Sequence, residues 1–166
     1  MRKTLPYLYL FITVLFLSCG GKEKKKKEGF TYEKIQTDTK QSNNNVKTLA
    51  SEKVDLKNKG IGPISELKLP ENIDQNLAKN GEAIFKKMCT ACHRPDKKFI
   101  GPAPKGILKT RTPEWIMNMI LNPEEMLRKD PLAKELLAEF NYAPMIKQDI
   151  SESDARAILE YYRTLD

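Results

Sequence analysis

Histidine and cysteine, the residues that most often bind metal ions or form disulfides, are scarce in this 166-residue sequence. There is one histidine, His93, and there are three cysteines, at positions 19, 89 and 92. A structural zinc site takes four such ligands, so no zinc site can form without using all of them. Two of the cysteines and the only histidine fall within five residues. The chemistry that they perform is therefore concentrated at one point of the chain.

Long apolar stretches are also missing, apart from one at the N-terminus. Two basic residues precede an apolar run from residue 5 to 17, which is short for a bilayer span and is typical of a signal peptide. The run ends in Phe-Leu-Ser-Cys-Gly, residues 16–20, which resembles a bacterial lipobox. We therefore predict a lipoprotein signal peptide over residues 1–18 and a lipid on Cys19. The alternative is an ordinary signal peptide with an incidental cysteine.

Large apolar residues are few between residues 20 and 58, where the chain cannot build a core. Residues 22–28 are almost all charged, and residues 41–45 are polar and turn-prone. We predict a flexible charged tether over residues 19–58, counted from the lipidated cysteine. A basic run beside a lipid can touch anionic head groups, but composition alone favours a solvated tether.

The formal charge of +7 is unevenly spread along the chain. Residues 79–166 hold 15 basic and 13 acidic residues, so most of the net charge lies before them, and it does not indicate a nucleic-acid partner. Residues 86–111 nevertheless hold eight basic residues against one acidic, whereas residues 112–166 hold six against eleven. This asymmetry predicts partners with acidic docking surfaces. The alternative is a solvated surface with charges on several faces.

From Gly60 the sequence changes character, and we predict a folded domain over residues 59–166. Residues 59–78 combine spaced apolar residues with two prolines, which indicates an extended arm that leads into a first helix. Helical spacing of apolar residues then ends at Cys89, and no alternating strand pattern follows. Later helix starts are predicted at three capped prolines and one capping serine: Thr112-Pro113, Asn122-Pro123, Asp130-Pro131 and Ser151. The predicted fold is a small all-α domain.

Residues 89–93 read Cys-Thr-Ala-Cys-His, the C-x-x-C-H signature of covalent haem attachment. Two thiols at this spacing can add across the two vinyl groups of haem, and the adjacent imidazole then binds the iron. A zinc site would also need Cys19, a thioredoxin-like pair would expect a strand before the motif, and a plain disulfide leaves the histidine unexplained. We predict one haem c, bound through Cys89, Cys92 and His93.

Around this motif, residues 81–166 resemble class I cytochrome c. Members of that family carry a glycine and an aromatic residue on the first helix, as Gly81 and Phe85 do here, and an aromatic-bearing last helix that crosses it. Because Gly81 has no side chain, the two helices can approach closely. The resemblance implies a class I cytochrome c fold wrapped around one haem. It also implies that the carbonyl of Pro102 accepts a hydrogen bond from the proximal histidine.

The resemblance further implies a methionine as the second axial ligand, in the loop before the last helix. Met145 stands in such a loop, within Asn-Tyr-Ala-Pro-Met, residues 141–145. The alternatives are water or another methionine: Met117, Met119 or Met126. Imidazole and thioether together favour a high potential and leave no open position for a substrate. We therefore expect an electron carrier and not an enzyme.

Trp115 is the only tryptophan, and it follows the predicted helix start at Thr112 by three residues. Packing in the core is the commoner position for such a side chain. The functional alternative is an indole N–H that donates to a haem propionate. On that basis Trp115 is a predicted cofactor-binding residue.

Together with the export signal, these features predict a membrane-anchored protein on the periplasmic side that shuttles single electrons between respiratory partners. The alternatives are a fixed haem subunit of a membrane oxidoreductase and a non-redox lipoprotein. Residues 111–125 resemble small lipoprotein cytochromes associated with bacterial nitrous oxide reduction. The expected partners are therefore redox proteins, with nitrous oxide reductase among them, and a membrane through the N-terminal lipid.

Overall fold

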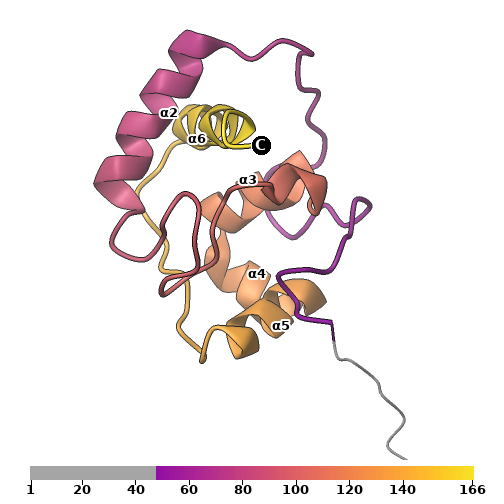
Figure 1. Ribbon diagram of the computed structural model, residues 1–166. Coiled ribbons are helices and arrows are strands. Elements are labelled where there is room, and N and C mark those ends of the chain that lie inside the picture. Colours follow the sequence, from indigo (N-terminus) through magenta and orange to yellow (C-terminus); the bar gives the residue numbers. More distant parts are fainter. Residues whose placement is uncertain (1–47) are drawn as a thin grey trace, which may run out of the picture. The chain divides into compact units, whose positions relative to one another are not determined.

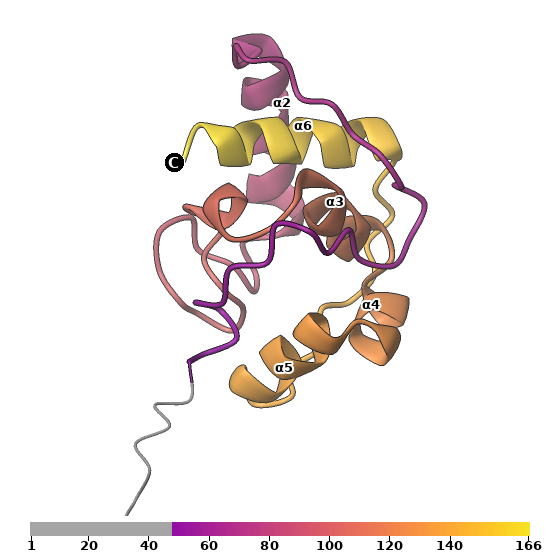
Figure 2. The same cartoon turned by 90° about the vertical axis from the view of Figure 1, so that its right-hand side faces the viewer.

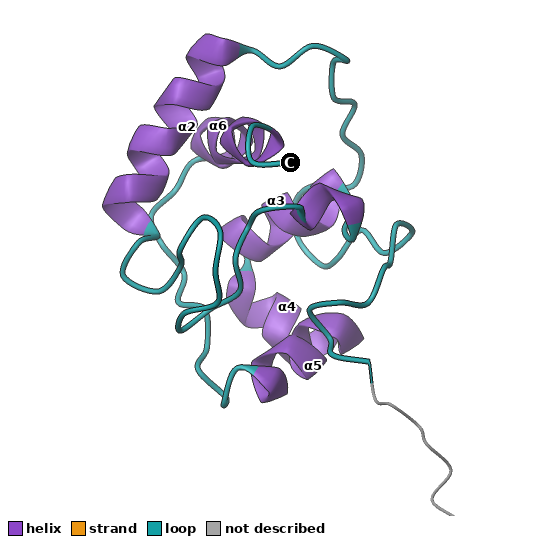
Figure 3. Ribbon diagram, in the orientation of Figure 1, coloured by secondary structure: helices purple, strands orange, loops and turns teal. Residues whose placement is uncertain are grey.

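The structure, a computed structural model, describes residues 48–166 (Figure 1). Within these residues, α-helices and one 3-10 turn are joined by loops, and no strand is present (Figure 3). In chain order the elements are α2 (Gln75–Met88), η2 (Ile107–Lys109), α3 (Pro113–Leu121), α4 (Pro123–Lys129), α5 (Pro131–Glu139) and α6 (Glu152–Arg163). The predicted all-α fold is confirmed.

The predicted signal peptide, the predicted lipid on Cys19 and the predicted tether as far as residue 47 lie outside the described residues. Among residues 48–166, no helix is both long enough and apolar enough to cross a membrane. The lipid anchor therefore stays a prediction from the sequence.

Three of the predicted helix starts are capped by the side chain that the sequence indicated. The side-chain oxygens of Thr112, Asp130 and Ser151 each accept a bond from the backbone N–H three residues later, at 3.1, 2.8 and 3.1 Å. Each bond satisfies an N–H group that a helix start leaves without a partner. Helix α4 also begins at its predicted proline, but the side chain of Asn122 donates to the carbonyl of Ile61 at 3.2 Å instead of capping it.

Helices α2 and α6 cross where α2 has no side chain (Figure 2). A Cβ atom at Gly81 would lie 1.9 Å from the carbonyl oxygen of Ala157, so only glycine permits this approach. Next to the crossing, the ring of Phe85 packs against Tyr161 and Tyr162 at centroid distances of 5.5 and 5.9 Å. Burial raises the pKa of Tyr162 well above its ordinary value. The predicted crossing of the first and last helices is confirmed.

The segment before residue 59 is packed on the domain. The carbonyl of buried Ala50 accepts a hydrogen bond from the guanidinium of Arg111 at 2.7 Å. Ser51 donates to the carboxylate of Glu139 through its N–H and its hydroxyl, at 2.8 and 2.6 Å. The predicted tether boundary at residue 58 is therefore wrong, because the folded part begins at Ala50 or earlier. This segment is held mainly by polar side chains that bind backbone groups. It therefore needs few apolar residues, and its composition resembles that of a linker.

The rest of the arm runs in extended form and is held by side chains of the helices. Asn118 on α3 is buried and bonds both the N–H and the carbonyl of Ile64, at 2.9 and 2.8 Å. The sulfur of Met126 on α4 accepts a bond from the N–H of Ile61 at 2.9 Å. Figure 1 shows the arm passing α3 before it reaches α2. An extended arm laid on the domain is what the sequence predicted.

A buried carboxylate joins the end of the arm to α6. Oε1 of Glu160, which has no exposed surface, accepts bonds from the N–H of Asp74 and from the guanidinium of Arg163, both at 2.8 Å. Its Oε2 forms an ion pair with Arg156 at 2.5 Å. Two cations around one carboxylate offset the cost of removing it from water. Because Asp74 caps α2, this network fixes the start of the helix that carries the motif.

Candidate functional site

The C-x-x-C-H motif begins at the end of α2 and continues as a tight turn. Cys89 is the C-cap of α2, and its N–H donates to the carbonyl of Phe85 at 2.9 Å. The carbonyl of Cys89 accepts from the N–H groups of Cys92 and His93, at 3.1 and 2.9 Å. These bonds bring both thiols and the imidazole onto one turn of the chain.

The ring of His93 is held by Gly101 and Pro102, in the loop that follows the motif. Its Nδ1 lies 2.8 Å from the carbonyl oxygen of Pro102. A carbonyl can only accept, so Nδ1 carries the proton and Nε2 is free to bind a metal ion. A Cβ atom at Gly101 would lie 2.5 Å from Cε1 of the ring, so glycine is required for this approach. The hydrogen bond that the resemblance implied is present in the structure.

The two thiols have different surroundings. Cys89 is half-buried, and burial, with a smaller contribution from Cys92, raises the pKa of its thiol to about 11. Cys92 is exposed, and both cysteines are free. The motif therefore presents one neutral thiol against the core and a second toward solvent, and both can form thioether bonds.

Met145 lies in the irregular loop between α5 and α6 and is partly buried against the core. Two of the alternative ligands are less suitable. Met117 is fully buried, and the sulfur of Met126 already accepts the N–H of Ile61 beside the arm. Met119 is partly buried on α3. Met145 therefore stays the predicted distal ligand, with Met119 as the remaining alternative within the domain.

Trp115 belongs to the core. Its side chain is 3% exposed, and its indole N–H donates to Oδ1 of Asp130 at 3.2 Å. The predicted hydrogen bond to a haem propionate is wrong, because the only indole donor is taken by a buried carboxylate. Asp130 also accepts from Asn58 of the arm at 2.7 Å. The signal that sequence reasoning missed was Asp130 itself, which it used only as a helix cap.

The basic residues between positions 86 and 111 are not equivalent. Arg111 is 3% exposed and binds the arm, so it is not a docking residue. Arg94 stacks over the ring of Phe99 at 4.2 Å, and Lys98 lies over the ring of Phe140 at 4.3 Å. Within residues 48–166, four lysines of this group are exposed and have no ion pair or aromatic contact: Lys87, Lys97, Lys105 and Lys109. The basic surface is therefore smaller than the sequence predicted.

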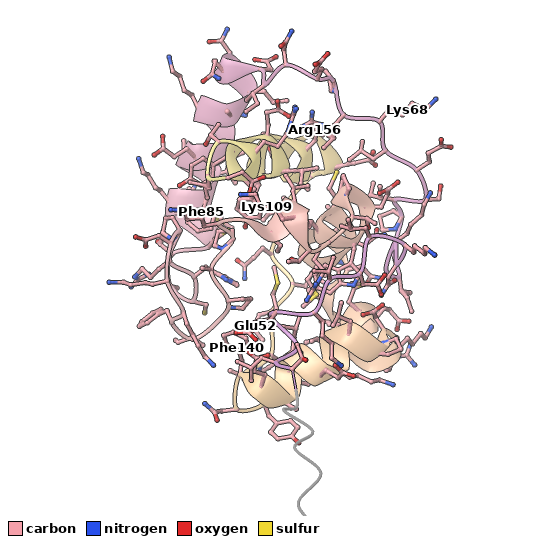
Figure 4. All side chains as sticks on the ribbon, turned by 45° about the vertical axis from the view of Figure 1, so that its right-hand side comes forward. Glu52, Lys68, Phe85, Lys109, Phe140 and Arg156 are labelled. Carbon is pink, nitrogen blue, oxygen red and sulfur yellow. The ribbon has the colours of Figure 1, made fainter. Side chains whose placement is uncertain are left out.

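Large apolar side chains are exposed on both loops near the motif. Phe99 and Ile100 precede Gly101, while Tyr142 and Ile146 flank Met145, and all four are 46% or more exposed. The contact between Lys98 and Phe140 shows that the two loops are adjacent. In Figure 4, Phe140 lies at the end of α5, on the same side of the molecule as the loop that follows α2. Exposed apolar groups gathered beside a donor set indicate a site that binds a large apolar group.

The residues present fit a covalently bound haem. Two free thiols stand on one turn, the imidazole has a fixed tautomer with Nε2 available, and a glycine leaves room for the ring. Each of these features is one that the attachment chemistry needs. A metal site of protein ligands alone is not indicated, since residues 48–166 contain no cluster of three or more His, Cys, Asp or Glu side chains suited to it.

Comparisons with known proteins agree with this interpretation. The model of the cytochrome c family matches residues 78–166. The cytochrome c of Rhodothermus marinus is 44% identical, with a TM-score of 0.61 over 70% of this chain and 93% of that structure. An engineered form of it, bound to a carbene intermediate, is 45% identical, with a TM-score of 0.58 over 70% of this chain and 94% of that one.

A curated relative, cytochrome c-551 of Stutzerimonas stutzeri, is 56% identical over 32 residues, which are 19% of this chain. The match spans about a third of that relative, 31% of its length. The family model covers more than half of this chain, and it begins just after the start of α2 and includes the motif and both loops. The chain therefore belongs to the cytochrome c family and carries a covalently bound haem c.

Proposed function

We propose that this protein is a one-haem electron carrier that is exported and held at a membrane by a lipid on Cys19, with the cytochrome domain on the periplasmic side. Haem-based electron transfer follows from its family. The observation that best supports a carrier is the fixed tautomer of His93, whose Nδ1 is bound to Pro102. Met145 in the neighbouring loop supplies a second ligand.

When bound, haem supplies a one-electron couple at its iron. Cys89 and Cys92 hold the group covalently, so it is not lost from a small domain. The carbonyl of Pro102 makes His93 a stronger ligand. The thioether of Met145 would favour a high potential and would occupy the position that oxygen or peroxide could otherwise take. We therefore propose a carrier and not an enzyme, and the carbene of the engineered relative concerns that protein alone.

A redox titration of the purified full-length protein tests the carrier proposal. We expect one reversible one-electron transition, with a ferrous form that binds carbon monoxide slowly because His93 and Met145 would both bind the iron. Rapid carbon monoxide binding by the unaltered protein would show an open position and contradict a simple carrier. More than one transition would contradict a single haem.

The lipid on Cys19 is tested by metabolic labelling with a fatty acid that carries a chemical tag. We expect label on the full-length protein and none on the Cys19→Ala variant. A mature chain that begins elsewhere and carries no label would contradict the anchor. Purification in mild detergent then separates a shuttle, which comes away alone, from a fixed subunit of a membrane oxidoreductase, which does not.

We propose that the protein docks on acidic surfaces of its redox partners through its exposed lysines at 87, 97, 105 and 109. Complementary charge raises association rates by about tenfold or more at low salt. We expect the pair Lys97→Glu and Lys105→Glu to slow electron transfer to the acceptor at low ionic strength and much less at high. The matched pair Lys79→Glu and Lys134→Glu makes the same charge change outside residues 86–111. Equal effects of the two pairs would contradict a localised docking surface.

Nitrous oxide reductase is the acceptor that the resemblance of residues 111–125 suggests. Most of this stretch is buried in α3 and at the start of α4, so its residues serve the fold and not a partner surface. The proposal therefore rests on the resemblance. Oxidation of the reduced protein by that enzyme, dependent on nitrous oxide, supports it, and no reaction at any salt concentration contradicts it.

A further inference from the structure

The loop after the motif is tied to the turn that carries His93. The guanidinium of Arg94 stacks on the ring of Phe99 at 4.2 Å and donates to the carbonyl of Thr90. The N–H of Phe99 donates to the carbonyl of Gly101 at 3.1 Å, and Gly101 is bonded back to the motif. A further bond, at 3.0 Å, joins Lys105 to Pro95. Residues 94–105, here called the proximal loop, are therefore held to the turn that carries His93 by several hydrogen bonds.

The loop that carries Met145, residues 140–151, here called the distal loop, is held by fewer hydrogen bonds along its middle part. Its start is fixed, because Phe140 is buried at the end of α5 and its N–H donates to Leu136 at 2.9 Å. Asn141 and Tyr142 follow with φ of +57° and +58°, the left-handed region that non-glycine residues rarely adopt. Backbone hydrogen bonds end at Ala143 and resume at Ile150 in this part of the structure. The position of the thioether therefore depends on how Phe140 and this turn are held.

One side chain connects the two loops. Lys98 belongs to the proximal loop, and its Nζ lies 4.3 Å from the centroid of the Phe140 ring. Resting on the proposed ligation by Met145, we propose that Lys98 is a positioning residue, which holds the distal loop against the proximal one through this cation–π contact. It acts on the thioether through Phe140 and the turn that follows. Its neighbour Lys97 is also exposed and has no aromatic contact among the described residues.

The effect expected from an exposed cation–π contact is modest. Its loss should raise the fraction of molecules in which the thioether has left the iron by about two- to fivefold, which corresponds to about 0.5–1 kcal/mol. Carbon monoxide reports this fraction directly, because it binds ferrous iron only when the distal position is open. It is also uncharged, so the change in surface charge does not by itself alter its approach.

The experiment compares Lys98→Gln with Lys97→Gln, which removes the same charge one residue away. We expect the rate of carbon monoxide binding to the ferrous holoprotein to rise about two- to fivefold in Lys98→Gln and to stay unchanged in Lys97→Gln. Lys98→Arg keeps a cation over the ring and should restore the original rate. In a Phe140→Leu background, Lys98→Gln should have no further effect, since the contact is already gone.

Equal rates in the two glutamine variants would overturn the proposal. A lower unfolding midpoint in Lys98→Gln with an unchanged binding rate would also overturn it, because the contact would then serve stability alone. Met145→Ala in the same series tests the ligand assignment itself. If that variant fails to accelerate binding, the proposed ligation is wrong; if it accelerates binding while Lys98→Gln does not, only the role of Lys98 is wrong.

Discussion

The two loops beside the haem site are both irregular, yet they are constrained to very different degrees. The loop after α2 holds His93 by a hydrogen bond to Pro102 and by the close approach of Gly101. Next to His93, Cys89 and Cys92 attach the haem through covalent bonds. The loop before α6 holds Met145 by partial burial and by contacts at its two ends. We therefore propose that His93 is a firmly held ligand and that Met145, the proposed second ligand, is exchangeable. Substitutions in the loop after α2 should remove the haem or displace His93. Substitutions in the loop before α6 should leave the haem attached and change its reduction potential.

The largest effect is expected on the fixed side. Replacement of both Cys89 and Cys92 by alanine removes every covalent bond to haem, so haem staining after denaturing electrophoresis should disappear. Each single variant keeps one thioether and should retain reduced staining. Staining that persists in the double variant would show that haem is attached elsewhere and would contradict the site.

Removal of Met145, the proposed second ligand, should leave the haem attached and free the position that the sulfur would occupy. Met145→Ala should lower the reduction potential and accelerate carbon monoxide binding by on the order of ten- to a thousandfold, since minor open states are commonly about 0.1–10% populated. Met119→Leu is the control for the remaining alternative ligand. Faster carbon monoxide binding in Met119→Leu, together with an unchanged rate in Met145→Ala, would assign the second ligand to Met119.

Gly101→Ala tests how closely the proximal ligand is held. A Cβ 2.5 Å from the ring of His93 must displace the imidazole or the loop, at a cost of about 3 kcal/mol, the upper end of the usual range for overpacking. We expect a lower unfolding midpoint together with a changed visible spectrum and potential. A destabilised protein with an unaltered spectrum would mean that the ring is not fixed by this contact.

Asn118→Ala supplies the contrast, because it lies in the scaffold and not in either loop. Its loss leaves the buried N–H and carbonyl of Ile64 without partners, at a cost of about 2 kcal/mol. Chemical unfolding should show this loss while the spectrum and the potential stay unchanged. A shifted potential in this variant would mean that the arm and the haem site are coupled, which the comparison of the two loops does not include.

The elements of the fold were predictable where local chemistry decides them. Thr112, Asp130 and Ser151 cap helices that begin at the next residue, and Gly81 marks the helix crossing. The motif at residues 89–93 identified the haem turn for the same reason, since its spacing is set by the chemistry of attachment.

Contacts between distant polar groups were not predictable. The packing of residues 50–58 depends on Arg111 and Glu139, which bind backbone groups and leave no apolar pattern in the sequence. Trp115 was assigned a haem contact because its true acceptor, Asp130, already had a local role as a cap. The contact between Lys98 and Phe140 joins loops that are far apart along the chain, and it appears only when the chain is folded.

Mass spectrometry of the purified full-length protein after proteolysis tests the central claim most directly. We predict that the peptide containing residues 89–93 carries one haem, linked to both Cys89 and Cys92, and that acidic organic solvent does not extract it. An unmodified peptide, or a haem that the solvent removes, would contradict a covalent c-type cytochrome.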